Sequence, residues 1–570
     1  MLQTRIPGMN TLRSIYQSIR TQQDEHTIGG RLLHQLHIRF RASQHDLALI
    51  PRSGPTILLL NHPTGLLEGA VLMEILHRIR PGVKFLANHR LAEIPELRDS
   101  IIPVDITTNT PQNNIAAMKH AAQHLANGGL LVVFPSGEVS SFHLRKLAVC
   151  DPAWHPSIAR LVTLANRRST GLQLVPAFIT GANSALFQCA GLIHPRLRTL
   201  LLVRELLNKQ NTEVELRIGR PIHATRLQEF PTDIERMDYL RWRTDLLSTR
   251  HRFKPQTNLP LQGNRSAQQP VGPPINPTLI ATEIAQLPAL VTTGDLSAYL
   301  ATAGQIPNAL QEIGRLREIT FRAAGEGTGK STDLDSFDPH YLHLFVWNHA
   351  KQEIAGAYRL ASTTANKALY TSTLFRYGPE FLQRLGPALE LGRSFVRVEY
   401  QKSFAPLLLL WKGIGAYIAA NPRYKVLFGP VSISNRYQSL SRDLMIGFLE
   451  RYAQLPEWKQ LVKTRNPFRR STTHTPDAFI PDIDQLSDLV NDIEASRDGI
   501  PVLLRQYLKL GGKLLGFNVD EEFSNVVDGL IVVDLTRTEP RLLERYLGRA
   551  EAHQFLAHHL PSREREQAVY

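Results

Sequence analysis

The chain has little cysteine and no long apolar run, and both absences exclude whole classes of protein. Only two of its 570 residues are cysteine, Cys150 and Cys189, too few for a disulfide framework or a cysteine-rich zinc site. The longest apolar runs, such as 130–134 and 407–411, fall far short of the roughly 20 residues that span a bilayer. Residues 1–20 lack the apolar core of a secretory signal. We therefore expect a cytoplasmic protein in a reducing compartment.

Motifs for metal and nucleic-acid binding are also missing. The 21 histidines form no His-Glu-x-x-His pattern, so we expect no bound metal ion, and no module typical of nucleic-acid binding is present. The net charge of +14 is uneven: residues 1–260 hold 31 Lys and Arg against 19 Asp and Glu, and the remainder holds 34 against 32. A basic first half suits an acidic carrier protein or anionic lipid as partner, and equally suits solubility alone.

The length and the composition along the chain predict two domains joined by a linker. Residues 252–278 are rich in Pro, Gln, Asn and Gly, so we place the linker there, between domains at 1–251 and 279–570. In each half, short apolar runs alternate with helical patterns, which predicts an α/β fold. The expected strands are 56–60, 83–87, 130–134, 172–178, 340–346, 353–360, 395–400 and 425–431. The expected helices are 66–79, 115–126, 310–323 and 405–420.

Two motifs with possible chemistry follow predicted strands in the first half. One strand leads into Asn61-His62-Pro63-Thr64-Gly65 and then Glu68; another ends in Phe134-Pro135-Ser136-Gly137-Glu138. Turns at the carboxyl ends of strands often hold catalytic residues. A histidine with a carboxylate at its other ring nitrogen is a general base with a fixed tautomer, and His62 with Glu68 fits this pattern. Either motif alone is equally consistent with an ordinary turn.

Together the two motifs resemble the glycerolipid acyltransferase superfamily, which includes lysophosphatidate acyltransferases. That family carries His-x4-Asp after one strand and Phe-Pro-Glu-Gly-Thr after a later one, and the resemblance covers about residues 30–225. Here the acidic residue lies one position further on and is Glu68, and Ser136 replaces the Glu of the later block. The variant is similar to the branch that acylates lyso-ornithine lipid. The resemblance implies that His62 and Glu68 are catalytic and that the acceptor is bound by Asn61, Pro135, Ser136, Gly137 and Glu138.

A series of charged residues in the second half resembles a different family. The series is Arg317 and Phe321 on a predicted helix, Asp335 and Asp338 before a strand, Arg359 at the end of another, and Glu390 and Arg393 ahead of a strand at 394–400. This order resembles the acyl-homoserine-lactone autoinducer synthases, which have a GNAT-type fold and transfer an acyl chain from acyl carrier protein to an amine. One Trp of that family, expected between Phe321 and Asp335, is absent, which implies a different amine.

The second half is more similar to the ornithine N-acyltransferase family, often labelled hemolysin. The similarity rests on the stretches 390–396, 410–414, 428–434 and 499–520, and covers about residues 300–540. N-acyl transfer needs a carboxylate to accept a proton from an ammonium, a role that we assign to Glu390. The substrate amino acid or a carrier-linked group would be bound by Arg317, Phe321, Asp335, Asp338, Arg359 and Arg393. A structural salt-bridge network would place the same residue types there.

The stretch 324–331 nearly spells a phosphate-binding loop, Gly-x4-Gly-Lys-Ser in the usual form. That motif follows a strand and opens a helix, whereas here a helical pattern precedes the glycines. We therefore expect no nucleotide at this loop, and expect the loop to be mobile.

These patterns predict a glycerolipid-acyltransferase-like domain fused to a GNAT-like domain, and the whole resembles a bifunctional ornithine lipid synthase. The resemblance implies an acyltransferase, transferring groups other than amino-acyl groups, that needs no cofactor besides acyl-acyl carrier protein. The second domain would N-acylate ornithine with a 3-hydroxyacyl group, and the first would esterify the 3-hydroxyl. Expected partners are acyl carrier protein, ornithine or a similar amino acid, and the inner-membrane surface. Glycine or glutamine as the amine, a phospholipid acyltransferase with a regulatory GNAT-like domain, and a membrane-active hemolysin remain open alternatives.

Overall fold

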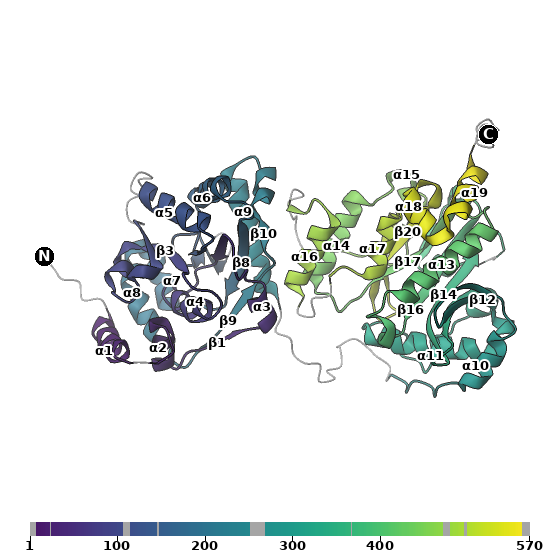
Figure 1. The fold of residues 1–570 in the computed structure, drawn as a ribbon, viewed down its shortest axis with the longest axis horizontal. Coiled ribbons are helices and arrows are strands. Elements are labelled where there is room, and N and C mark those ends of the chain that lie inside the picture. The colour runs from purple at the N-terminus through teal and green to yellow at the C-terminus, as the bar shows by residue number, and fades with distance from the viewer. Residues whose placement is uncertain are drawn as a thin grey trace. The chain divides into compact units, whose positions relative to one another are not determined.

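The computed structural model describes residues 7–22, 24–105, 114–144, 147–250, 268–365, 368–470, 479–494 and 499–560 (Figure 1). The chain divides into two compact units, residues 1–253 with 491–497 and residues 254–490 with 498–570. The division falls within the stretch 252–278 that we expected as a linker, of which 252–267 lie outside the described residues. Each unit is built around its own sheet.

The first unit has a mostly parallel sheet with strand order β1-β9-β8-β2-β5-β3-β4, to which β10 adds beside β8. The central strands β2, β5 and β8 run parallel and are almost wholly buried, as expected for strands covered on both faces. The strands are β1 Arg39–Ala42, β2 Thr56–Leu60, β3 Lys84–Asn88, β4 Ile101–Val104, β5 Leu130–Val133, β8 Gln173–Ile179, β9 Glu213–Ile218 and β10 Ile222–His223. A separate hairpin is formed by β6 Ser141–His143 and β7 Ala148–Cys150.

Helices pack on this sheet by burying their apolar side chains against those of the strands. Leu67, Val71 and Leu72 of α4 share one buried cluster with Leu58 and Leu60 of β2. The helices are α1 Met9–Arg20, α2 Ile28–Gln35, α3 Gln44–Ala48, α4 Leu67–His77, α5 Ile115–Ala126, α6 Pro156–Arg168, α7 Ala185–Ile193, α8 Pro195–Leu207 and α9 Asp233–Leu246.

The second unit has a mainly antiparallel sheet of order β11-β12-β13-β14-β16-β17-β20-β19. The strands are β11 Ala289–Thr293, β12 Leu296–Thr302, β13 Leu342–Asn348, β14 Glu353–Ser362, β16 Ala388–Val396, β17 Val426–Ile433, β19 Lys513–Asp520 and β20 Val526–Asp534. Only β16 and β17 run parallel, and they pair no further than Glu390 with Phe428, although both strands continue. The sheet therefore splays open between β16 and β17.

Helices cover opposite faces of this second sheet. The side chains of neighbouring strand residues point to opposite sides of a sheet. On β14, Arg359 donates to Asp335 on the side where α11 lies. The ring of Tyr358 contacts Trp411 of α13 on the other side. The helices are α10 Pro277–Ile284, α11 Pro307–Ala323, α12 Pro379–Leu385, α13 Ala405–Ala420, α14 Ser439–Tyr452, α15 Pro456–Lys459, α16 Ile483–Ile493, α17 Val502–Lys509, α18 Pro540–Leu547 and α19 Arg549–His559; the last three residues of α16 belong to the first unit. A small pair of strands, β15 Phe375–Tyr377 and β18 Val462–Thr464, completes the unit.

Most predicted elements are present, with one clear error. Strand 56–60 and helices 115–126 and 405–420 have the predicted bounds as β2, α5 and α13. The strand predicted at 395–400 is wrong: β16 spans Ala388–Val396, and a short 3₁₀ helix, Val398–Tyr400, follows. Glu390 and Arg393 therefore lie inside a strand, because the apolar residues Ala388, Leu389 and Leu391 extend the buried run backwards.

Within the part of the chain that the structure describes, no helix combines the length and apolar character that crossing a membrane requires.

Candidate functional site

The sheet of the first unit brings the two predicted motifs together. β2 and β5 are parallel neighbours, so the turns after their carboxyl ends meet at one edge of the sheet. The imidazole of His62 stacks on the ring of Phe134, with centroids 4.4 Å apart, and the N–H of Ser140 donates to the carbonyl oxygen of His62 over 2.8 Å. Residues 78 positions apart in the chain thus form one site.

His62 and Glu68 lie side by side, as the spacing predicts. Nδ1 of His62 lies 3.5 Å from Oε1 of Glu68, which is an ion-pair contact and too long for a good hydrogen bond. The Glu68 carboxylate accepts hydrogen bonds from the N–H and hydroxyl of Thr64, over 2.5 and 2.7 Å, and from the N–H of Gly65. It is thereby held in place in the first turn of α4.

The charge of Glu68 is maintained although the residue is buried. Burial alone would raise the pKa of this carboxyl, but the His62 imidazole and the donors of Thr64 outweigh it and lower the pKa to about 2. The carboxylate is therefore ionised at neutral pH and can stabilise an imidazolium. Nδ1 of His62 makes no hydrogen bond within the described residues, so its contact with Glu68 is electrostatic.

The other predicted residues of the first unit mainly shape the two turns. Asn61 is occupied by the backbone of Ile179 on β8: its Nδ2 donates to the carbonyl oxygen, and its Oδ1 accepts from the N–H. The Ser136 hydroxyl donates to the carbonyl oxygen of Glu138, across Gly137 with its left-handed φ of 65°. The carbonyl oxygen of Pro135 accepts from the N–H of His155.

Two residues that sequence reasoning missed support this site. The Asp151 carboxylate accepts from the backbone N–H of His62 over 3.2 Å and from the hydroxyl of Ser140 over 2.5 Å, so it joins the two turns. Arg198 on α8 pairs with the exposed carboxylate of Glu138 over 3.1 Å. Neither could be found from motif spacing, because both lie on segments distant in sequence.

In the second unit, arginines and aspartates of the predicted series form one buried network. Arg317 donates to Asp338 over 2.7 Å and Arg359 to Asp335 over 2.6 Å. Both arginine side chains are fully buried. Arg393 lies 3.9 Å from Asp335. The two guanidinium groups beside Asp338 hold the pKa of its carboxyl well below the usual range, against the effect of burial.

The network leaves donors for which the described residues provide no partner. Nε and Nη2 of both Arg317 and Arg359 make no hydrogen bond within the part of the chain described. Arg359 is instead packed among the rings of Phe337, Tyr341 and Tyr370, whose centroids lie 5.8, 5.0 and 5.1 Å from its guanidinium carbon. Arg393, with a left-handed φ of 46°, lies over Phe523 at 4.6 Å. The predicted Phe321 packs edge-on against the same Phe523.

Glu390 has the most hydrogen bonds of the predicted series. Its buried carboxylate accepts from the hydroxyls of Tyr341 and Thr371 and from the backbone N–H groups of Tyr370 and Thr371. These bonds anchor the short helix Tyr370–Thr373 against β16. A carboxylate with four donors is held firmly, so its environment is that of a structural anchor.

Three carboxylates that sequence reasoning missed lie around the splayed strands. Burial and the nearby Asp520 raise the pKa of Asp528, on β20, to about 7, although the hydroxyl of Ser432 on β17 donates to it over 2.6 Å. Burial and Asp528 raise the pKa of Glu326 to about 8. Asp520 accepts from the hydroxyl of Tyr370 over 3.3 Å. Carboxyl groups that titrate near neutral pH are suited to proton transfer.

Glu326 belongs to the loop that nearly spells a phosphate-binding motif, and this loop has a defined conformation. Glu318 accepts from the N–H groups of Thr328 and Gly329, while Ser434 and Ser524 donate to carbonyl oxygens of Ala324 and Gly327. Side chains from three other segments thus bond its backbone, and the expected mobility of the loop stays a prediction.

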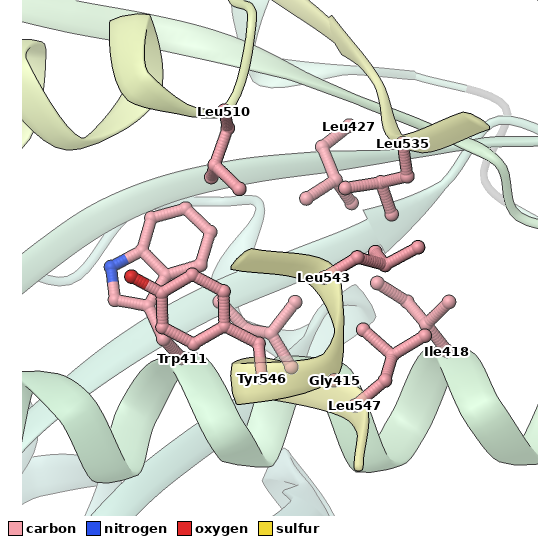
Figure 2. A pocket seen from close by; sticks show the side chains of 10 residues that line it. Trp411, Gly415, Ile418, Leu427, Leu510, Leu535, Leu543, Tyr546 and Leu547 are labelled. Carbon is pink, nitrogen blue, oxygen red and sulfur yellow. The ribbon is translucent and has the colours of Figure 1, made fainter. Parts of the chain in front are cut away.

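An apolar pocket occupies the other face of this sheet, against α13. Figure 2 shows the ring of Tyr546 beside the indole of Trp411, with Leu510, Leu543 and Leu547 around them. The lining contains no charged side chain and none of the predicted site residues. The pocket therefore has no group for acid–base catalysis at neutral pH.

Comparisons with known proteins agree with both halves of this description. A family model described as "Acyltransferase" matches residues 37–251, and one described as "Acetyltransferase (GNAT) domain" matches residues 316–412. The chain is thus an acyltransferase with an acyltransferase-like α/β domain followed by a GNAT-like α/β domain, as predicted.

The relatives define the family more closely. A glycine N(alpha)-acyltransferase from Bacteroides thetaiotaomicron is 32% identical over 299 residues, covering 47% of this chain and 87% of that protein. An L-ornithine N(alpha)-acyltransferase from Brucella abortus is 28% identical over 271 residues, covering 44% of this chain and 90% of that protein. The chain belongs to the family of these N(alpha)-acyltransferases.

Two solved structures show partial similarity to this chain. The 1-acyl-sn-glycerophosphate acyltransferase PlsC from Thermotoga maritima matches with 15% identity and a TM-score of 0.23, over 41% of this chain and 85% of that chain. The CoA-dependent acyl-homoserine lactone synthase BjaI matches with 13% identity and a TM-score of 0.23, over 44% of this chain and 88% of that chain.

Proposed function

We propose that the chain makes ornithine lipid in two acyl transfers, one in each unit. The second unit transfers a 3-hydroxyacyl group from acyl carrier protein to the α-amine of ornithine, so that an amide forms, the carrier thiol leaves and the amine loses a proton. The first unit then esterifies the 3-hydroxyl with a second acyl group. The observation that carries this proposal is the presence of two separate polar clusters, His62 with Glu68 and the network around Arg359, in one chain.

The N-acylation step requires a proton acceptor and a holder for the amino acid. Arg317 and Arg359 have N–H groups left over from their ion pairs, and such groups can bind a carboxylate. Glu390 was our candidate for the proton acceptor, but its four donors favour a positioning role. The environment of Asp528, whose pKa lies near 7, supports that residue in its place.

The acidic groups at the splayed strands support ornithine as the amino acid. Ornithine carries a second ammonium on its side chain, and Glu326, Asp520 and Asp528 offer counter-charges for it. Their proton affinity in the empty protein would fall when a cation binds, so the carboxyls would ionise on binding. Glycine is the second candidate, because the relative with 32% identity acts on glycine.

The O-acylation step follows from the geometry of His62. Nε2 would take the proton of the lyso-lipid hydroxyl as that oxygen attacks the thioester, and ionised Glu68 would stabilise the imidazolium. The ester would form as the C–S bond breaks, and the imidazolium would return the proton to the departing thiolate. The turn that contains Ser136 and Gly137 borders this site and would position the acceptor.

The proposal extends to the partners. Acyl carrier protein is acidic, and the +12 balance of residues 1–260 suits its docking. The lyso-lipid is a single-chain amphiphile that partitions into membrane, so the cytoplasmic protein would associate peripherally with the inner membrane.

Lipid mass spectrometry in a bacterial host without aminolipids tests the function. Wild type should produce a diacyl ornithine lipid, His62→Ala should accumulate the lyso form, and Asp528→Asn should produce neither. Asp484→Asn, which changes an exposed carboxylate of the same unit, is the matched control and should behave as wild type.

Isotope-labelled ornithine and glycine, supplied separately, identify the head group in the same experiment. If the new lipid contains label from glycine and none from ornithine, glycine is the head group. Absence of any new aminolipid, with soluble protein and donor present, would contradict the proposal.

A further inference from the structure

Large apolar side chains are exposed on one set of elements in the first unit. Leu144, Leu147 and Val149 of the β6–β7 hairpin are 67, 79 and 41% exposed. Leu186, Leu192, Ile193 and Leu197 of α7 and the start of α8 are 51, 53, 79 and 39% exposed. Single exposed apolar residues are common, but seven on one hairpin and two helices call for an explanation.

These three elements form one surface. The hairpin packs on α7, where the N–H of Phe142 donates to Oε1 of Gln188 over 2.9 Å, and α7 packs against α8 (Figure 1). We call this surface, made of the described residues 141–144, 147–150 and 185–204, the hairpin–α7–α8 face. Leu147 adopts a left-handed φ of 49°, a conformation that costs free energy for a leucine, and its side chain nevertheless points to solvent.

The charge of this face has one sign. Of the side chains that the structure describes on this face, Arg198 and Arg204 are basic, and none is Asp or Glu. The next carboxylate, Glu205, is fully buried and accepts from the hydroxyl of Ser184. The exposed Glu138 beside the face is paired with Arg198. An apolar surface with cationic neighbours is complementary to the interface of a bilayer that contains anionic lipid.

The face also adjoins the His62 site. Gly65, three residues after His62, has a φ of 104°, and a Cβ there would lie 2.8 Å from Cδ2 of Leu202 on α8 and 3.0 Å from Cγ2 of Val139. The helix therefore packs directly against both turns of the site. This packing places the face beside the turn that contains His62.

We propose that the hairpin–α7–α8 face docks the protein on the surface of an anionic phospholipid bilayer. This inference rests on the proposed function only in that the acceptor is a membrane lipid. Leucine and isoleucine side chains insert below the headgroups, and the basic residues contact lipid phosphates. An acidic protein would be attracted by the same charges, but it would not require so much exposed aliphatic surface.

Vesicle sedimentation with the purified full chain tests the docking face. The probes are vesicles of phosphatidylcholine alone and of phosphatidylcholine with phosphatidylglycerol. Wild type should bind the anionic vesicles, and the double variant Leu144→Glu with Ile193→Glu should bind them at least about tenfold more weakly, since each 1.4 kcal/mol of lost insertion is a factor of ten. Ile234→Glu changes a 63% exposed side chain of α9 and should bind as wild type.

Three results would overturn this inference. Wild type could fail to bind vesicles, or the double variant could bind them as well as wild type does. The double variant could also keep vesicle binding and lose only its binding to acyl carrier protein. Unchanged thermal unfolding of the double variant checks that it is folded, as its two sites are solvent-exposed. Because no acyl donor or amino acid is present, the result does not depend on whether the proposed synthesis occurs. Lipid synthesis from detergent-dispersed substrate, retained in the double variant, separates docking from catalysis.

Discussion

Glu390 and Asp528 show how different the surroundings of two buried carboxylates are in one unit. Glu390 accepts four hydrogen bonds and anchors the helix Tyr370–Thr373. Asp528 accepts one hydrogen bond, from Ser432, and its pKa is raised to about 7 by burial and by Asp520. The first arrangement stabilises structure, and the second retains a group that can exchange a proton at neutral pH.

Substitution separates these roles. Glu390→Gln replaces an acceptor oxygen by a donor facing other donors, so we expect a loss of about 1–3 kcal/mol in the free energy of unfolding. Asp528→Asn should preserve stability and remove N-acylation. Chemical denaturation together with an assay of the lyso-lipid measures both. A stable but inactive Glu390→Gln protein, with Asp528→Asn fully active, would return the proton-acceptor role to Glu390.

The raised pKa of Asp528 also predicts a pH dependence of stability. The folded protein holds this proton more tightly than the unfolded chain, so the stabilisation is complete below about pH 4 and is lost as the pH rises to about 7. The difference in unfolding free energy between wild type and Asp528→Asn should therefore fall across this interval. Urea unfolding at several pH values measures it, and a difference independent of pH would contradict the assignment.

At the scale of elements, α13 packs closely because two of its residues are glycine. A Cβ on Gly415 would lie 2.2 Å from the carbonyl oxygen of Tyr546, in α18, and one on Gly413 would lie 2.8 Å from Leu344 of β13. Both glycines thus serve the packing of α13 against its neighbours.

Gly415→Ala should therefore destabilise the second unit. The obstacle is backbone, which moves less readily than a side chain end, and overpacking costs about 1–3 kcal/mol. Gly69→Ala is the matched control: Gly69 lies within α4, and a Cβ there would meet no atom within 4 Å. That control should be neutral or more stable by about 0.4–1 kcal/mol. Thermal unfolding compares them, and equal effects would contradict the packing argument.

At the scale of the whole molecule, the two clusters belong to separate compact units with separate cores. No residue of the His62 site is needed to build the network around Arg359, because each is assembled by its own sheet. A variant in one cluster should accordingly leave the other chemistry intact.

Co-expression of His62→Ala and Asp528→Asn chains tests this independence. We expect the diacyl aminolipid to be restored, since one chain supplies N-acylation and the other supplies O-acylation of a membrane-borne intermediate. Lipid mass spectrometry measures the diacyl product and the lyso form. Accumulation of the lyso form without the diacyl product would show that both sites must act within one chain.

Local sequence determined much of this protein: the presence of two α/β domains, the bounds of β2, α5 and α13, and the nearness of His62 to Glu68. These features follow from periodicity and short spacing, because strand ends and first helical turns are set by neighbouring residues. The predicted strand at 395–400 failed, since the start of β16 depends on burial between β14 and β17.

Only the tertiary structure decided the surroundings of the buried carboxylates. Asp151 and Asp528 accept hydrogen bonds from residues distant in sequence, His62 for Asp151 and Ser432 for Asp528. Burial and charge together set a pKa, and both depend on how strands pair and on which loops pack against them. The same holds for the hairpin–α7–α8 face, whose apolar residues resemble core residues in sequence and are shown to be exposed only by the fold.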